Sequence, residues 1–428
     1  MSDPGYQYAN AGASPRSAYD TVLKDFYEGP IRKHLNNKVT ILQYVEKSKR
    51  KWTGRQVLFP VHLRRNTGVG ARSETGTLPT AGRQTYVESK IKAKHLYGRI
   101  TLTGAVIAAS KGDRGAFASA LRTEVDGMRT DLRNDMNRQC FGNNVTIAPT
   151  QPGDDVNLTG ISGVLGIVSN VVGTTVTVTN PGTRFLKQGM NIHVGTHDEL
   201  MAGNHQTTSV SSVTDTADFV KDAAGTVEQH DIIVRGDASD HSFGNEITGL
   251  DTIVEGSGEL QGIDPASSGE WVAKKFDNGG VSRPLSLELM QLAVDAADEI
   301  GGTEPDVIMG HHSMRREYVN LLTSDVRYAP EQLKGGFQKL TYAGGSTPIT
   351  IEFDKHAPYN KLFFIRSSDI KLYVQQDWKW ADRDGSTFSR LQNQDAWEAF
   401  MLWYGNLGCE RRNSHVVITD LQAKNLIF

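Results

Sequence analysis

The sequence predicts an α+β fold, and three features of its pattern indicate this. Two strand-like segments joined by a polar loop precede one long amphipathic helix. A block of short β-like runs follows, and then a mixture of helices and strands. At roughly 150 residues per domain, the 428 residues suggest about two or three folded units. The chain is 38% hydrophobic and 22% charged, which is typical of globular proteins rather than disordered ones.

Positive and negative charges separate along the chain. Residues 1–142 carry 24 Lys and Arg against 12 Asp and Glu, whereas residues 143–282 carry 6 against 18. The densest basic block runs from Arg32 to Arg72, where Glu46 is the one acid. This pattern indicates either nucleic acid on the basic face or copies of the chain that pair a basic arm with an acidic body. A solvated surface, the ordinary reason for a charge run, does not explain the separation.

Several classes of protein are excluded by composition. No stretch approaches the roughly 18 consecutive apolar residues of a membrane span, so we expect no membrane partner. The first fifteen residues have neither a basic flank nor an apolar segment, so we expect no secretory signal. Cys140 and Cys409 are too few for a disulfide framework or a zinc module.

The N-terminal third predicts a ribbon. We expect a flexible tail over residues 1–16 and a short helix that begins near Ser17. Residues 55–63 and 85–95 then alternate as strands, and Gly98 marks a predicted bulge where the alternation changes phase. About twenty polar and glycine-rich residues lie between them. Because an isolated two-stranded ribbon is marginal in water, we expect this arm to lie on a neighbouring subunit.

The clearest helix runs from Asp113 to Cys140. Gly127 lies in the middle of this helix and is a candidate bend or hinge. The apolar positions step by three or four residues and form one stripe: Phe117, Leu121, Val125, Met128, Leu132, Met136 and Cys140.

The remaining sequence predicts a small β-domain and then a mixed region. Residues 143–246 are acidic, with short strands at 166–172, 174–179, 190–194 and 231–235, typical of a small barrel or sandwich. A helix opened by Pro284 and closed by Gly301-Gly302 follows, then a strand at 307–309 and a helix at 314–322. We expect strands at 361–366, 370–376, 396–404 and 415–419.

The motifs of enzymes and metal sites are missing from the sequence. His193, His197, Asp198 and Glu199 lie at a strand end, where residues four apart do not share a face as they do on a helix. The His311-His312 pair precedes a helix, where a loop or capping role is the simpler interpretation.

Two further patterns are incomplete. Asp382 and Asp384 lack the other ligands of a calcium loop, and a hairpin turn explains them better. No phosphate-binding loop or nucleophile elbow occurs. We therefore expect no enzyme activity, no catalytic residues, no metal site and no cofactor.

The order of these segments resembles a tailed-bacteriophage major capsid protein of the Hong Kong 97-type fold. The likeness depends on residues 54–82, 96–110, 113–142, 247–254 and 359–418. It implies an N-terminal arm (1–52), an E-loop ribbon (53–110), a P-domain spine helix (111–142), an A-domain (247–358) and P-domain return strands (359–428). The acidic β-domain at 143–246 is an insertion into that pattern. The E-loop has no lysine between Lys51 and Lys90, so we expect no lysine–asparagine cross-link there.

This resemblance implies self-assembly into hexamers and pentamers of an icosahedral shell that encloses double-stranded DNA, bound non-specifically. The expected partners are further copies of the chain, a separate scaffolding protein, a portal and possible decoration proteins; the expected location is the virion, after assembly in the host cytoplasm. An encapsulin-like compartment that stores an enzyme remains an alternative, as does a cytosolic enzyme or binding protein that uses the β-domain.

Within this picture, opposite charges on neighbouring copies are the candidate contacts, and Gly127 is the candidate hinge of the spine helix. The basic candidates are Arg64, Arg65, Arg72 and Arg83, and the acidic candidates are Asp198, Glu199, Asp218 and Asp222.

Overall fold

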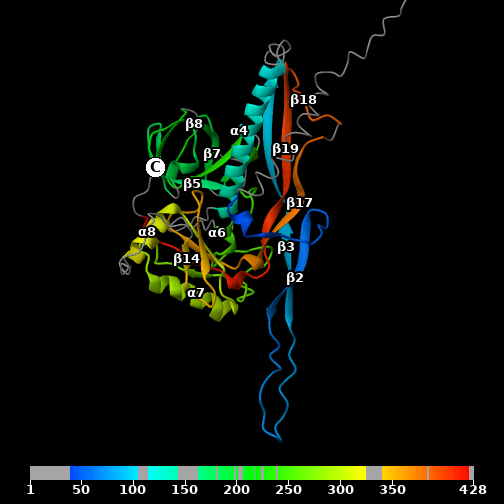
Figure 1. Cartoon of the computed structure of the whole chain (residues 1–428), viewed down its shortest axis with the longest axis vertical. Helices are drawn as coiled ribbons and strands as arrows, with labels where there is room; N and C mark the ends of the chain where they lie inside the picture. Colours follow the sequence, from blue (N-terminus) through cyan, green and yellow to red (C-terminus); the bar gives the residue numbers. More distant parts are fainter. Residues whose placement is uncertain are drawn as a thin grey trace, which may run out of the picture. The chain divides into compact units, whose positions relative to one another are not determined.

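The chain divides into two compact units in the computed structural model (Figure 1). The smaller unit holds residues 1–43, 95–136 and 374–405, and the larger holds 44–94, 137–373 and 406–428. The described residues are 39–104, 114–142, 162–179, 182–196, 199–200, 206–215, 217–222, 226–237, 240–323, 340–382 and 385–423. The predicted tail and the helix near Ser17 lie outside them.

The smaller unit combines a sheet with most of one long helix. Strand β19 (Ala396–Cys409) lies between β17 (Ile370–Trp380) and the short β18 (Ser389–Arg390), and it also pairs with β4 (Lys94–Thr103). The strand ends at 94, 370–373 and 406–409 belong to the larger unit. Helix α4 (Arg114–Phe141) confirms the predicted helix within one residue at each end. Six positions of its predicted stripe are buried, from Leu121 to Cys140. Phe117 belongs to the first turns, whose side chains lie outside the description.

Gly98 on β4 has a different role from the one predicted. Strand β4 buries every second residue without interruption, so the predicted bulge at Gly98 is wrong. The phase changes earlier, at Ala93, where β3 (Thr85–Lys92) has ended and β4 begins. A Cβ atom at Gly98 would stand 2.6 Å from Leu132 Cδ1 of α4, so glycine here allows the strand and the helix to pack closely.

A six-stranded sheet forms the main core of the larger unit. The two central strands, β13 (Val307–Gly310) and β16 (Leu362–Ile365), are buried throughout, and their uninterrupted apolar sequences reflect this. Helices α7 (Leu287–Gly301) and α8 (His312–Thr323) pack against this sheet. The remaining strands are β12 (Lys274–Phe276), β20 (Val416–Ile418), β15 (Ile349–Phe353) and β14 (Leu340–Tyr342).

Helix α7 begins later than predicted. Pro284 precedes the helix rather than opening it, because Ser286 is the N-cap and its hydroxyl accepts a hydrogen bond from the Leu289 amide at 3.2 Å. The predicted end is confirmed: Gly302 adopts a left-handed conformation with φ of 64° and caps the helix.

The acidic block contains a sheet that closes on itself. Six strands pair in a ring, because β10 contacts both β5 and β7. They are β5 (Val164–Val172), β6 (Thr175–Thr179), β7 (Asn191–Gly195), β8 (Gln206–Val213), β9 (Asp218–Lys221) and β10 (Ile232–Asp237). A short strand, β11 (Asp240–His241), continues from β10. Apolar side chains including Val168, Val194 and Phe219 fill the interior of the ring.

A separate two-stranded ribbon belongs to the larger unit (Figure 1). Strand β2 (Gln56–Arg64) runs antiparallel to β3, from the Gln56–Lys92 pair to the Arg64–Thr85 pair. Before it, β1 (Glu46–Lys47) pairs in parallel with the start of β17 at Lys371 and Leu372. The two predicted ribbon strands are therefore confirmed, although the second ends at Lys92 instead of continuing to residue 95.

Candidate assembly interface

The root of the ribbon, which consists of the paired strands β2 and β3, is anchored on the chain's own larger unit. Along β2, Val57, Phe59 and Val61 are buried, whereas the side chains between them are exposed. Phe59 stacks on Tyr373 with ring centroids 6.1 Å apart, and the Arg50 guanidinium lies 4.7 Å from the centre of the Phe59 ring. The root of the ribbon therefore already packs on its own chain, contrary to the expectation that the whole arm needs a neighbouring subunit.

The ribbon tip, residues 65–84, remains at the surface. Its side chains are exposed at most positions, and two apolar ones are unusually so: Val69 is 77% and Leu78 is 83% accessible. Its hydrogen bonds are local, as in the 3.0 Å contact from the Gly76 amide to the Ser73 carbonyl. Exposed large apolar side chains on a narrow ribbon mark a surface that is suited to a partner.

The two limbs of the tip approach each other at a pair of glycines. A Cβ atom at Gly68 would stand 2.9 Å from the Gly82 nitrogen, and one at Gly82 would stand 2.9 Å from the Gly68 nitrogen. The Asn66 side chain lies beside both and accepts a hydrogen bond from the Gly68 amide at 2.7 Å. Glycine at both positions thus lets the tip remain a narrow double strand.

The four predicted basic residues divide between the root of the ribbon and its tip. Arg64 Nε donates to Glu270 at 3.1 Å, so this arginine is bound within its own chain. Arg72 bends back, and its Nε donates to the Thr77 carbonyl at 3.1 Å. Arg65 and Arg83 are exposed on the tip. The structure therefore gathers three predicted arginines on the tip and uses the fourth to fasten its root.

The predicted acidic residues are less available. Glu199 caps its own turn by accepting from the Thr196 amide at 2.8 Å. Asp222 accepts from the Ser211 hydroxyl at 2.6 Å, and Asp218 is half-buried at the start of β9. Asp198 lies outside the described residues. Asp218 is the first residue of β9 and Asp222 follows its last residue. No contact among the described residues brings Glu199 to either of them.

The hinge candidate lies in an unobstructed stretch of helix. Gly127 is exposed within α4, and an added Cβ atom would meet nothing within 4 Å. Packing therefore does not require glycine there, and the hinge remains a prediction.

A cavity of about 440 Å³ lies beside the root of the ribbon. Its walls combine strand β2 with the loop after β19 and with the Glu270-Trp271 pair. The Arg50 side chain pairs with Glu410 at 3.1 Å in this wall. The lining residues are Arg50, Phe59, Pro60, Val61, His62, Leu63, Glu270, Trp271, Glu410, Arg411, Arg412 and Asn413.

A buried arginine next to this cavity holds the turn after helix α6 (Leu250–Ile253). Arg412 is 1% exposed, and burial lowers the pKa of its guanidinium to about 10. Its nitrogens donate only to backbone carbonyls, the shortest at 2.8 Å to Glu255. The acceptors are the carbonyls of Thr252, Ile253, Glu255, Ser257, Gly258 and Trp271. Sequence reasoning missed this residue, because a lone arginine after a strand carries no motif.

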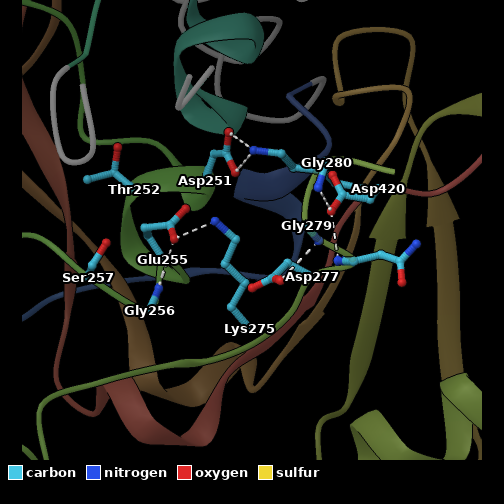
Figure 2. Close-up of polar contacts among 12 residues, drawn as sticks. Asp251, Thr252, Glu255, Gly256, Ser257, Lys275, Asp277, Gly279, Gly280 and Asp420 are labelled. Carbon is cyan, nitrogen blue, oxygen red and sulfur yellow. Dashed lines mark hydrogen bonds and ion pairs between the residues drawn. The ribbon is translucent and has the colours of Figure 1, made fainter. Parts of the chain in front are cut away.

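Two lysines bind α6 and the turn that follows it. Lys361 Nζ lies 2.8 Å from both carboxylate oxygens of Asp251, and Lys275 Nζ lies 2.8 Å from Glu255 Oε1. Figure 2 shows Lys275 reaching toward Glu255, with Asp251 on the preceding helix α6. Asp420 stabilises the loop that follows β12 by accepting from the amides of Asn278 and Gly280 (Figure 2). All of these contacts hold backbone in place.

The described residues hold no cluster of three or more metal-ligating side chains. His193 is buried and its Nδ1 lies 2.9 Å from the Thr207 hydroxyl, while His197 and Asp198 fall outside the description. His311 Nδ1 accepts from the Ser313 amide at 3.2 Å, which is a capping role at the start of α8. Burial raises the pKa of both cysteine thiols, Cys140 and Cys409, to about 12. None of the described helices has the length and apolarity to cross a bilayer.

Comparison with known proteins places this fold among phage capsids. No family model and no curated protein matches the sequence. Among solved structures, the capsid asymmetric unit of cyanophage A-1(L) is similar over 98% of this chain and 97% of that one, with 12% identity and a TM-score of 0.54. The capsid of Myoviridae phage XM1 is similar over 89% and 91%, with 6% identity and a TM-score of 0.42. The cyanophage match shows that the chain has the fold of a phage capsid protein.

Proposed function

We propose that this chain is the major capsid protein of a tailed bacteriophage with the Hong Kong 97-type fold. Copies would assemble as hexamers and pentamers into an icosahedral shell around double-stranded DNA, with no catalytic step performed by the chain. The observation that carries the proposal is the likeness to the cyanophage capsid subunit over almost the full length of both chains.

The ribbon supplies the physical reason for assembly. Its root is buried on its own unit, but its tip exposes Val69 and Leu78 and three arginines to solvent. Covering apolar surface contributes roughly 25 cal/mol per Å². A contact that repeats around a closed ring of identical copies uses the same tip and the same receiving surface in every copy. A neighbouring subunit would therefore cover the apolar side chains and the arginines of the tip that the isolated chain leaves exposed.

The proposed parts follow the order of the capsid fold. Residues 1–52 would form the N-terminal arm, 53–110 the E-loop, 111–142 the spine helix of the P-domain, 247–358 the A-domain, and 359–428 the returning P-domain strands. Residues 143–246, which contain the closed sheet of β5–β10, would be an inserted domain. A scaffolding protein, a portal and decoration proteins would be separate chains, and assembly would take place in the host cytoplasm before the shell becomes part of the virion.

The direct test is to image the purified chain. Size-exclusion chromatography and negative-stain microscopy should show shells or ring-shaped capsomers of uniform size. A discrete monomer at every concentration and salt tested, with a ribbon tip that resists protease, would contradict the proposal. Nuclease-protected DNA in particles from the native source would distinguish a genome shell from a compartment that stores an enzyme.

A shortened ribbon provides the matched control. Replacing residues 66–83 with a two-residue Asn-Gly turn keeps the buried root, including Val57 and Phe59, and removes only the exposed tip. We expect this variant to retain the circular dichroism spectrum and unfolding midpoint of the parent while its particle yield falls at least tenfold.

A further inference from the structure

We propose that the seam between the closed sheet of β5–β10 and the part of the larger unit built around the six-stranded sheet is an acid-sensitive joint. When His356 takes up a proton, the closed sheet is released and turns about the segment that follows it, while both folds remain intact. The seam consists of helix η4 (Gly182–Phe185) on one side, and of residues 354–357 after β15 with the end of α4 on the other. Opening of the seam does not require assembly of the chain.

Each side of the seam has a hydrophobic core of its own. Val194 belongs to the cluster inside the closed sheet, and Phe364 belongs to a separate cluster between the six-stranded sheet and its helices. Helix η4 is part of the closed sheet's side, because the Thr183 hydroxyl donates to the Asp215 carbonyl at 2.6 Å. Domains with separate cores and a polar contact between them can move relative to each other once that contact is lost.

Arg184 and Phe185 of η4 reach across the seam to the turn after β15. Arg184 Nη1 donates to the Ala357 carbonyl at 3.1 Å, and its Nη2 donates to the His356 carbonyl at 3.3 Å. The Phe185 ring stacks on the His356 imidazole with ring centroids 6.3 Å apart. The guanidinium groups of Arg184 and Arg138 lie 4.5 Å and 5.7 Å from the centre of the Phe185 ring. His356 therefore meets the other side of the seam through both its backbone and its side chain.

The hydrogen bonds of the His356 ring require its neutral form. His356 Nδ1 lies 2.9 Å from Asn137 Nδ2 of α4, and because an amide nitrogen can only donate, Nδ1 accepts. The proton of the neutral ring is therefore on Nε2, and a second proton can bind only at Nδ1, where it meets the amide hydrogens of Asn137. Asp354 Oδ1 lies 3.3 Å from Nδ1, but this carboxylate already accepts from Asn137 Nδ2 at 2.8 Å and from the His356 amide at 2.7 Å. Protonation thus breaks the bond between α4 and the turn.

Positive charge predominates around the His356 ring. Burial is the largest cause that lowers the pKa of His356; Asp354 opposes this shift, and Lys355 on the same turn and Arg184 on η4 add to it. Burial lowers the pKa of Arg184 to about 10, so this group stays charged when His356 titrates. The further charged and titratable groups near the seam are Arg138, Glu246, His311, His312, Arg316 and Tyr359.

Acid favours the open seam. An open seam exposes His356 to water and restores its ordinary pKa of about 6.5, whereas the closed seam holds that pKa lower. Closure therefore weakens as the pH falls from about 6.5 toward the lowered value, and at pH 5 the ratio of open to closed molecules rises by at most about thirtyfold. The Glu246 carboxylate binds Arg138 in a buried ion pair, and the Ile247 amide donates to Gln139 Oε1 at 3.2 Å, so the segment after β11 keeps hold of α4 and acts as the pivot.

The distance between two spin labels in the full-length chain tests the joint. Val213→Cys on β8 and Leu292→Cys on α7 place one label on each side of the seam, at side chains that are 41% and 48% exposed. The native thiols of Cys140 and Cys409 are buried and should not react. Labelled chain is diluted into an excess of unlabelled chain, so that pulsed electron paramagnetic resonance measures distances within one copy. From pH 7.5 to pH 5 we expect the ratio of molecules at a new distance to those at the original distance to rise at least fivefold, with an unchanged circular dichroism spectrum.

Two substitutions at position 356 should act in opposite directions. His356→Asn keeps an oxygen that can accept from Asn137 but does not titrate, so its seam should stay closed at both pH values. His356→Lys carries a permanent positive charge, so its seam should already be open at pH 7.5. His62→Asn changes an exposed histidine of the ribbon and is the matched control, which should respond to acid as the parent does.

Three results would count against the joint. An acid response of equal size in His356→Asn and in the parent would overturn the assignment to His356. A seam that is open at both pH values in His356→Asn would also overturn it, because packing of the imidazole rather than its charge would then hold the seam closed. Loss of the circular dichroism spectrum of the parent between pH 7.5 and pH 5 would contradict a joint that opens before either fold is lost. None of these results depends on whether the chain forms shells.

Discussion

Arg64 Nε lies 3.1 Å from one carboxylate oxygen of Glu270 and 3.2 Å from the other, and this pair marks where the ribbon leaves its own body. On one side of Arg64 the ribbon packs on Tyr373 and Arg50 through Phe59; on the other, residues 65–84 are mostly exposed. An ion pair between residues that are 206 positions apart thus lies where the anchored root ends and the exposed tip begins.

Glu270→Gln should loosen the root of the ribbon without unfolding the chain. The backbone amide of Glu270 itself and the Arg64 guanidinium lower the pKa of this carboxyl, so the ion pair persists at neutral pH and is lost as the pH falls through that lowered value. We expect trypsin to cleave after Arg64 and Arg65 several times faster, with the unfolding midpoint unchanged. Glu259→Gln is the control, and equal cleavage rates in the two variants would contradict the role of the pair.

Gly98→Ala should destabilise the smaller unit. The new methyl group would stand 2.6 Å from Leu132 Cδ1 and 3.0 Å from Leu132 Cγ, so the buried leucine or the strand must move. Overpacking of this kind costs about 1–3 kcal/mol. Urea unfolding of the unassembled protein should show a lower midpoint with an unchanged slope. A midpoint equal to that of the parent would show that the interface of β4 and α4 adapts freely.

Gly127→Ala should stabilise α4 and hinder any bending of it. Nothing lies within 4 Å of the added methyl group, and alanine is favoured over glycine in a helix by up to about 1 kcal/mol. If Gly127 is a hinge that changes when a precursor shell expands, the variant should slow that expansion, which time-resolved scattering can follow. Unchanged expansion kinetics in a variant with a raised melting temperature would remove Gly127 as a hinge.

Arg412→Met should strongly destabilise the larger unit. The substitution removes the donor for six backbone carbonyls, which belong to α6, the turn that follows it and Trp271, and leaves buried acceptors without partners. We expect a large loss in the free energy of unfolding, because each buried carbonyl left without a donor costs about 1–3 kcal/mol. Arg412→Lys keeps the charge and three donors and should lose less. Equal losses in the two variants would indicate that burial of the side chain, rather than its hydrogen bonds, matters.

His311→Asn should reduce the sensitivity of the chain to mild acid. Burial, and then the charges of Arg184, His312 and Arg316, lower the pKa of His311 to about 4, although Asp354 opposes this shift. Because the unfolded chain binds a proton near pH 6.5 and the folded chain does not, stability is lost as the pH falls from about 6.5 toward 4.

Asparagine can still cap α8, as His311 does through its contact with the Ser313 amide, but it does not titrate. The difference in urea midpoint between pH 7.5 and pH 5 should therefore shrink in this variant. It should not vanish, because burial also lowers the pKa values of His312 and His356. An unchanged difference would exclude His311 as a source of the acid sensitivity.

Elements with a local pattern could be predicted from the sequence. A helix or strand with one buried face repeats its apolar residues at a regular spacing, which can be recognised in the sequence. The stripe of α4 from Leu121 to Cys140 and the two ribbon strands show such spacing, and both were predicted within a few residues. Strands β17 and β19 were predicted too short, since their extensions to Trp380 and Cys409 depend on pairing with strands far away in the sequence.

Which charged side chains form ion pairs could not be predicted from the sequence, because it depends on how the chain folds. Arg64 and Arg65 are adjacent, chemically identical and both exposed, but Glu270 binds the first and no described residue forms an ion pair with the second. Gly98 and Gly127 likewise look equivalent in sequence, yet one faces Leu132 and the other faces open space. Contacts between residues far apart in the chain produce no periodic pattern in the sequence. They depend on how the elements pack together rather than on the spacing of residues within any one helix or strand.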